Sequence, residues 1–195
     1  VSKTSYFAQS NNGNSNSTAT SDNSKRVYID NLTMKSDNIA EDFEQLINVY
    51  REGIETNIAT FETKVPLKEQ WISSHNLSCT VVAIHCGALV GFATLSPFSK
   101  RHVYRGVGEI SIYVSKKVRG LGIGSILMSD FIKVTEDNGY WTLLAKIFPE
   151  NEPSLKLHVK HGFKIVGKLQ KIGQTEQGEW KDNIFLERRS ELVGV

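Results

Sequence analysis

The fold of this chain is indicated most strongly by one stretch, Val114-Ser115-Lys116-Lys117-Val118-Arg119-Gly120-Leu121-Gly122-Ile123-Gly124-Ser125. Alternating residues precede it from Glu109, and apolar residues at helical spacing follow it to about Asp137. Its glycines permit a tight bend between strand and helix because they have no Cβ. The first amides of a helix lack partners within the helix and lie at the positive end of its dipole. The stretch therefore predicts a strand–turn–helix unit whose turn can hold a phosphate.

The turn itself, residues 119–125, departs from two common phosphate-binding patterns; we call it the glycine turn. The dinucleotide pattern G-x-G-x-x-G fails because Ser125 stands where its last glycine belongs, and no Walker G-K-S/T follows. Arg119 and the pair Lys116–Lys117 add positive charge beside the turn, which favours a pyrophosphate. A purely structural turn with solvated lysines is the alternative interpretation of this segment.

The sequence on either side alternates helices and strands. Strands are predicted at 27–29, 79–85, 89–95, 109–114, 141–147, 163–169 and 183–187, with Gly87 turning a hairpin between the second and third. Helices are predicted at 38–49 with a Ser36–Asp37 cap, after Pro66, at 122–137 and at 153–160. This order predicts an α/β (α+β) fold in which helices cover both faces of one mixed sheet.

Length and composition indicate one soluble domain. A chain of 195 residues predicts a single domain, and no apolar run approaches the roughly 20 residues of a membrane span. Residues 1–24 are mostly Ser, Asn and Thr, so we expect a disordered leader and a single domain over 25–195. A net charge of +2 gives no indication of nucleic-acid binding. Neither a nucleic acid nor a membrane is an expected partner.

Cys79 and Cys86 lie in apolar, β-rich sequence. We interpret both as buried small hydrophobes in a reducing compartment, which predicts a cytoplasmic protein; a disulfide or a catalytic thiol is the alternative. The Cys and His residues do not have the spacing of a metal site, so no metal is predicted.

Four blocks in one order resemble a known enzyme family. Arg119-Gly120-x-Gly122-x-Gly124, after a strand with Glu109-x-Ser111-x-Tyr113, resembles the acyl-CoA-binding motif of GCN5-related N-acetyltransferases (GNAT). The other three blocks resemble phosphinothricin acetyltransferases: Thr60-Phe61-Glu62-Thr63 with Glu69-Gln70-Trp71, Asn151-x-Pro153-Ser154 with Leu157-His158, and Gly178-x-Trp180-x-Asp182. The resemblance covers about residues 26 to 188. It implies the GNAT fold, with a mostly antiparallel central sheet, and an acetyl-CoA-dependent N-acetyltransferase that forms a homodimer.

The resemblance also implies which residues bind acetyl-CoA as co-substrate. In this family the glycine turn holds the CoA pyrophosphate, and the preceding strand splays to bind the pantetheine arm. Backbone amides can do this without a particular side chain. The implied contacts are Ile112, Tyr113, Val114, Arg119, Gly120, Leu121, Gly122, Ile123, Gly124, Ser125 and Asn151.

An amine must lose a proton before it attacks a thioester, so a general base is required. The resemblance implies that Glu109 is this base, and alternation places it on the same strand face as Tyr113. His158 matches the second catalytic candidate of the family, four residues after Ser154 on one helix face. Imidazole titrates in the right range to accept or relay the proton, although it could also only orient the substrate. An exposed strand carboxylate and a helix-surface histidine are the structural alternatives.

The segment Pro97-Phe98-x-x-Arg101-x-x-Tyr104 resembles the family's loop for the acidic end of the acceptor. It implies that Arg101 pairs with a carboxylate while Tyr104 and Phe61 wall the pocket; an ordinary loop arginine is the alternative. Ser99 replaces a Lys of some herbicide-detoxifying members. The expected acceptor is therefore a small amino acid-like amine of the phosphinothricin, methionine sulfone or methionine sulfoximine type. A protein N-terminus, a polyamine, or CoA binding without catalysis are the alternatives.

Overall fold

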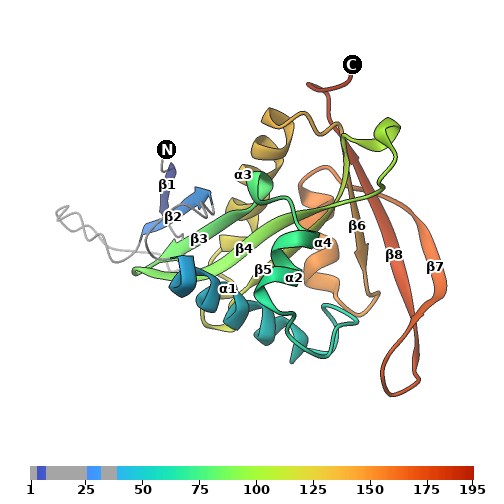
Figure 1. Ribbon diagram of the computed structural model, residues 1–195, viewed down its shortest axis with the longest axis horizontal. Helices are drawn as coiled ribbons and strands as arrows, with labels where there is room; N and C mark the ends of the chain where they lie inside the picture. The colour runs from blue at the N-terminus through green and yellow to red at the C-terminus, as the bar shows by residue number, and fades with distance from the viewer. Residues whose placement is uncertain (1–3, 8–25, 32–38) are drawn as a thin grey trace, which may run out of the picture.

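A mixed sheet forms the centre of the computed structural model, which describes Thr4–Phe7, Arg26–Asn31 and residues 39–195 (Figure 1). Within these ranges its eight strands lie in the order β1-β2-β3-β4-β5-β6-β8-β7, and only β5 and β6 are parallel neighbours. The strands are β1 (Thr4–Phe7), β2 (Arg26–Asn31), β3 (Val81–His85), β4 (Ala88–Pro97), β5 (Val107–Val114), β6 (Thr142–Ile147), β7 (Lys164–Gln174) and β8 (Trp180–Arg189). The predicted mixed, mostly antiparallel sheet is confirmed.

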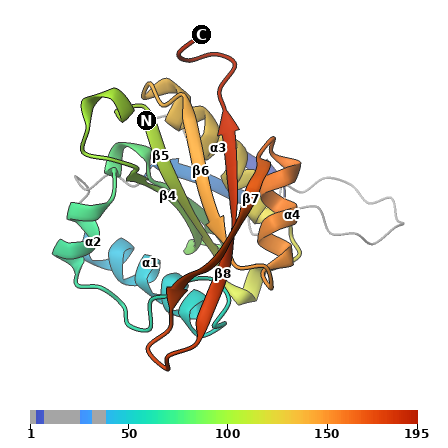
Figure 2. The same cartoon turned by 90° about the vertical axis from the view of Figure 1, so that its right-hand side faces the viewer.

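Helices cover both faces of this sheet, as predicted (Figure 2). They are α1 (Ile39–Ile54), α2 (Lys68–Ser74), α3 (Ile123–Asp137) and α4 (Glu152–Lys160). One buried cluster packs around Leu127 and Phe131 of α3, and a second joins Leu46 of α1 and Trp71 of α2 to the opposite face. None of the helices in the described parts of the chain is both long and apolar enough to cross a membrane.

The first helix continues past its predicted end at residue 49, because Tyr50 and Gly53 extend its packed face onto β5. Tyr50 lies edge-on to Tyr113, with ring centres 4.9 Å apart. A Cβ on Gly53 would lie 2.6 Å from the Tyr113 ring, so a glycine is needed for this close approach.

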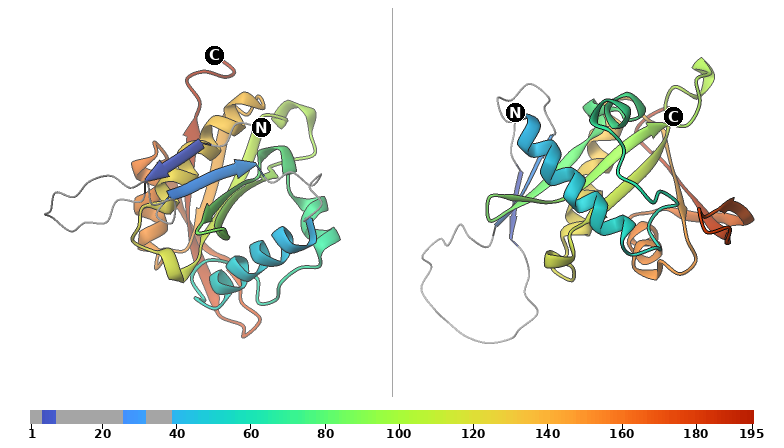
Figure 3. Two further views of the ribbon diagram at one scale, coloured as in Figure 1. Left: turned by 90° about the vertical axis from the view of Figure 1, so that its left-hand side faces the viewer. Right: turned by 60° about the horizontal axis from the view of Figure 1, so that its bottom comes forward.

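The sheet opens between its two parallel strands. Pairing of β5 with β6 runs from Val107–Thr142 to Glu109–Leu144 and then stops, although β5 continues to Val114 and β6 to Ile147. Beyond that point β5 pairs with β4, and β6 pairs with β8. Figure 3 (right) shows that the β7–β8 hairpin lies at the opposite edge of the sheet from β1. This opening between β5 and β6 positions the site described below.

Two predictions about the edges of the molecule need correction. Thr4–Phe7, inside the predicted disordered leader, forms β1 and pairs antiparallel with β2; residues 1–3, 8–25 and the Ser36–Asp37 cap lie outside the described residues. Cys79 is buried as predicted, but Cys86 is exposed. It occupies the hairpin turn with Gly87, where both residues have positive φ (52° and 77°), and such a two-residue turn projects beyond the core.

Candidate active site

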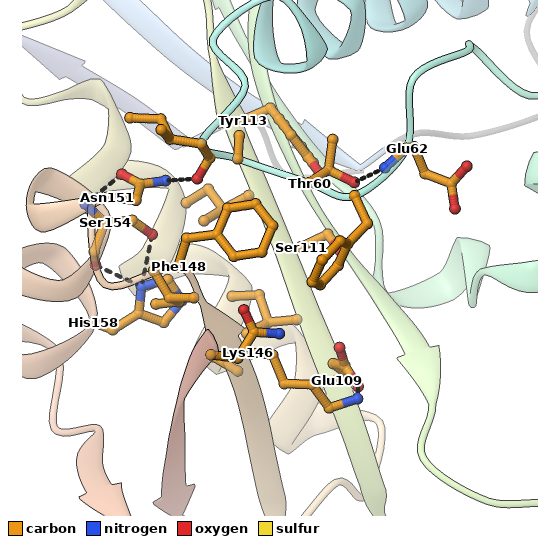
Figure 4. A pocket seen from close by; sticks show the side chains of 18 of the residues that line it. Thr60, Glu62, Glu109, Ser111, Tyr113, Lys146, Phe148, Asn151, Ser154 and His158 are labelled. Atoms are coloured by element: carbon orange, nitrogen blue, oxygen red, sulfur yellow. Dashed lines mark hydrogen bonds and ion pairs between the residues drawn. The ribbon is translucent and has the colours of Figure 1, made fainter. Parts of the chain in front are cut away.

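The opening between β5 and β6 leads into a cavity of about 420 Å³, which we call the main cavity (Figure 4). Its walls come from the loop after α1, from β5, β6 and α4, and from the β7–β8 hairpin. Glu109 and His158, the two predicted catalytic residues, both line it, and Figure 4 places them on opposite sides. Phe61, predicted to wall the acceptor pocket, lines it as well.

A second cavity of about 250 Å³, the side channel, adjoins the main cavity. The two cavities share residues on β5 and α4, including Ile112, Tyr113, Asn151 and Ser154. From there the side channel passes between α1 and α4 to Arg119, the first residue of the glycine turn. The predicted acyl-CoA residues on β5 therefore lie between the predicted catalytic residues and the predicted phosphate site.

The glycine turn has the backbone that its sequence predicts. Gly120 and Gly122 have φ of 81° and 78°, a left-handed conformation that side chains other than glycine rarely adopt, and Gly122 is the N-cap of α3. A Cβ on either glycine would meet no atom within 4 Å, so their outer side is open. Ile123 is 1% exposed and offers a ligand only its backbone, while the Ser125 hydroxyl lies 2.7 Å from Nε2 of His161. The helix start can therefore receive an anion on its free amides.

Glu109 is held by a residue that the sequence analysis missed. Its Oε2 lies 2.7 Å from Nζ of Lys146, on the neighbouring strand β6, and the two side chains are 32% and 38% exposed. Figure 4 shows Glu109 and Lys146 next to each other at the edge of the main cavity. A single charged residue in the apolar strand 142–147 was the signal that could have identified Lys146. Glu109 is thus a partly exposed carboxylate with a cationic partner.

His158 is buried rather than on the helix surface, with 2% of it exposed. Its Nδ1 lies 2.8 Å from the carbonyl oxygen of Ser154, and its ring packs edge-on to Phe163. A carbonyl oxygen can only accept, so Nδ1 carries the proton and Nε2 of the neutral ring is left as an acceptor. Burial lowers the pKa of His158, which keeps the ring neutral at pH 7.

Asn151 and Tyr113 fix the boundary between the two cavities. Asn151 caps α4 by accepting from the Ser154 N–H at 3.3 Å, and its Nδ2 donates to the Ile58 carbonyl at 3.2 Å. Tyr113 stacks on Phe92, and burial raises the pKa of its hydroxyl. Both side chains therefore hold the loop after α1, helix α4 and strand β5 in fixed relation around the cavities.

Phe61 closes the outer side of the main cavity. Its ring lies edge-on to Phe148, with centres 4.7 Å apart. On its other side it packs against β7, where a Cβ on Gly173 would lie 2.5 Å from the Phe61 ring. A glycine is needed at position 173 because the Phe61 ring occupies the space that a side chain there would fill.

Arg101 and Tyr104 are not brought to this site. Both are exposed in the loop between β4 and β5, and neither lines the main cavity or the side channel. The Arg101 guanidinium instead lies 5.6 Å from the centre of the Tyr104 ring, which is edge-on to Phe98. The structure therefore gives no acceptor contact to these two residues of the predicted substrate site.

Asn183 is a second lining residue that sequence reasoning missed. It lies on β8, is 5% exposed, and its Oδ1 is buried without a hydrogen-bond partner. Nothing in the local pattern of β8 sets this asparagine apart from a surface residue. Across the ranges that the structure describes, no three His, Cys, Asp or Glu side chains are grouped as metal ligands.

Comparisons with a family model and with individual proteins point to the same family. Residues 41–163 match the model of the acetyltransferase (GNAT) family. The chain is 30% identical over 157 residues to phosphinothricin N-acetyltransferase of Streptomyces viridochromogenes, covering 78% of this chain and 85% of that protein. It is 27% identical over 152 residues to the L-methionine sulfoximine/L-methionine sulfone acetyltransferase of Pseudomonas aeruginosa, covering 75% and 88%.

A solved structure is similar over most of the chain. The phosphinothricin acetyltransferase of Sinorhizobium meliloti, in complex with AcCoA, superposes with a TM-score of 0.69 and 29% identity, covering 80% of this chain and 86% of that one. The match to the family model and the shared fold agree with the position of the glycine turn and its neighbouring cavities. This chain belongs to the acetyltransferase (GNAT) family and is an N-acetyltransferase.

Proposed function

We propose that the protein transfers the acetyl group of acetyl-CoA directly to the primary amine of a small amino acid-like acceptor. One observation carries this proposal: the cavity that holds Glu109 and His158 adjoins a channel that leads to the glycine turn. The names of the relatives, which act on phosphinothricin and on methionine sulfoximine or sulfone, support this acceptor class.

Acetyl-CoA fits this arrangement from one end to the other. The pyrophosphate binds the backbone of residues 120–125 at the start of α3, with Arg119 beside it. The pantetheine arm follows residues 112–114 of β5, where pairing with β6 has ended and that edge of the strand is open. The thioester then lies where the side channel meets the main cavity, next to Asn151 and Ser154.

In the reaction that we propose, Glu109 accepts a proton from the ammonium of the acceptor. The neutral amine attacks the thioester carbonyl, so a C–N bond forms while the C–S bond breaks and CoA leaves as a thiolate. A backbone amide near Val114 stabilises the negative charge that develops on the carbonyl oxygen. His158, with Nε2 free of a proton, accepts or relays the second proton of the amine.

We also propose a homodimer, in which the C-terminal hairpin lies near the partner. Four large apolar side chains of this hairpin are between 52% and 59% exposed: Ile165, Val166, Ile172 and Trp180. Three of them lie on the edge strand β7 and Trp180 on its neighbour β8, and exposed apolar residues at a sheet edge favour association. Light scattering at high concentration tests this, and a mass of one chain would contradict it.

The acetylation experiment uses the full chain with acetyl-CoA and a panel of amines. The panel contains phosphinothricin, methionine sulfone, methionine sulfoximine, common amino acids, a polyamine and a peptide with a free N-terminus. Mass spectrometry detects acetylated products, and a thiol reagent follows CoA release. We expect acetylation of the amino acid-like members. Products from the peptide or polyamine alone would favour the alternative acceptors, and CoA binding without any product would indicate a non-catalytic module.

A further inference from the structure

The proposed base, Glu109, has a cationic partner within the protein. Its Oε2 accepts from the Lys146 ammonium at 2.7 Å, which is the geometry of a charge-assisted hydrogen bond. Both side chains line the main cavity. While Lys146 occupies Oε2, the carboxylate can receive the ammonium of an acceptor only through Oε1. A group on the acceptor that draws Lys146 away would free both oxygens of Glu109.

We propose that the acidic group of the acceptor is what releases Glu109, by taking Lys146 as its own ion-pair partner. This inference rests on the proposed function and specifies its substrate class: α-amino acids with a free carboxylate. The ammonium and the carboxylate of such a molecule are one carbon apart, so they can meet Glu109 and Lys146 at the same time. One ion pair inside the protein is exchanged for two ion pairs with the substrate.

The sheet places the residues for this exchange on one face. Glu109 pairs with Leu144 of β6. Lys146 is two residues further along β6, so it lies on the same face of the sheet and is the diagonal neighbour of Glu109. Lys146 pairs in turn with Phe185 of β8, which makes Asn183 its diagonal neighbour on that face. Three adjacent strands thus present a carboxylate, an ammonium and a carboxamide to one cavity.

Asn183 supplies a place for a further hydrogen bond. Its Oδ1 is buried and has no partner, and a buried acceptor without a donor is costly to the folded protein. The ammonium of the acceptor brings three N–H groups, of which Glu109 takes one. A second can donate to Asn183, which would satisfy this oxygen when the substrate is bound.

Lys146 is the cationic partner that the described lining of the main cavity provides for an acidic group of the acceptor. Among the described residues that line it, Lys146 is the sole lysine or arginine, and Glu62 adds a further negative charge. Burial keeps His158 neutral, as its lowered pKa indicates. Arg101, for which the family resemblance implied this role, lies in the exposed loop between β4 and β5.

The experiment compares an amino acid with its decarboxylated amine, for example L-methionine sulfone and 3-(methylsulfonyl)propylamine. The measured quantity is the ratio of the two kcat/KM values in the wild type, in Lys146→Met and in Lys146→Arg. We expect the wild type to prefer the acid by on the order of 10- to 100-fold, the scale of one charge-assisted bond. Lys146→Met should abolish this preference, because the acid loses its cationic partner while Glu109 is freed to act on the amine. Lys146→Arg should restore most of it.

Lys156→Met is the matched control, because Lys156 forms an exposed ion pair with Glu152 on α4. This control should keep the wild-type ratio. Circular dichroism and calorimetry with acetyl-CoA verify that each variant is folded and binds the co-substrate. An active Lys146→Met enzyme with an unchanged ratio would overturn the inference and leave the proposed function intact. The same conclusion would follow if Arg101→Ala lost the preference for the acid while Lys146→Met kept it. A wild type that acetylates no amine would reject both.

Discussion

The Nδ1–H of His158 donates to the carbonyl oxygen of Ser154 across 2.8 Å, inside a helix that caps the main cavity. This bond fixes the tautomer, so that the second ring nitrogen is an acceptor. His158→Asn keeps a side-chain N–H that can reach Ser154 but removes that acceptor. We expect kcat to fall about 10²-fold with little change in acetyl-CoA affinity. Steady-state kinetics beside calorimetry tests this, and a normal kcat would show that Nε2 takes no part.

Burial also makes stability depend on pH. It lowers the pKa of His75, His158 and His161 below the ordinary value of 6.5. Below that pH the unfolded chain binds protons that the folded protein does not, so the free energy of unfolding falls as the pH drops toward the folded pKa values. Above pH 6.5 these three histidines no longer make the free energy of unfolding depend on pH. The melting temperature should therefore fall on acidification from about pH 7 to 5.5, and it should fall less in His158→Asn. An equal fall in both proteins would mean that His158 does not contribute.

Glu109→Gln keeps the shape of the proposed base but cannot accept a proton. We expect kcat to fall by on the order of 10²–10⁴, while the acetyl-CoA affinity measured by calorimetry stays near that of the wild type. Because Gln can still accept from Lys146, the cavity should keep its form. Wild-type turnover in this variant between about pH 6 and 9 would exclude the base role.

Gly122→Val tests the phosphate site, with Gly139→Val as its control. Both glycines have left-handed φ, 78° and 82°, and at both a Cβ would meet nothing within 4 Å. Each valine should thus cost a similar 1–2 kcal/mol or so of stability, measured by denaturant unfolding. Only Gly122→Val should weaken acetyl-CoA binding, by on the order of 10- to 100-fold, because only its side chain meets the anion. Equal affinities in the two variants would place the pyrophosphate elsewhere.

Gly173→Ala pushes Phe61 into the main cavity, since the new Cβ would lie 2.5 Å from its ring. An overpacking cost of about 1 kcal/mol should appear as a roughly fivefold higher KM for the acceptor, with the KM for acetyl-CoA unchanged. Gly167→Ala on the same strand is the control, because a Cβ there meets no atom within 4 Å. If both variants keep the wild-type acceptor KM, Phe61 is not a wall of the acceptor site.

Much of the fold could be predicted from local pattern. The glycine turn and the order of the elements follow from spacing and alternation over short stretches, whereas Glu109 and His158 were implied by the family resemblance. Lys146 could not be found in this way, because its partner Glu109 is 37 positions away and the two meet only through the β5–β6 pairing. β1 was missed for the same reason, since Thr4–Phe7 forms a strand by pairing with β2. That Arg101 lies outside both cavities could not be predicted, because a sequence motif does not give the direction of a loop.

The short pairing between β5 and β6 has a consequence for the mechanical integrity of the protein. Among the described residues, only the pairs from Val107–Thr142 to Glu109–Leu144 connect the two halves of the sheet by strand pairing, and each half carries its own outer strands. A CoA molecule lying in this gap would connect the two halves, with contacts to β5 on one side and to the N-terminus of α4 on the other. Its binding energy adds to the folded state by mass action, by about 2.7 kcal/mol when the ligand is at a hundred times its Kd. Acetyl-CoA would then also stabilise the folded enzyme, so the enzyme would be more stable in a cell rich in acetyl-CoA than in one that lacks it.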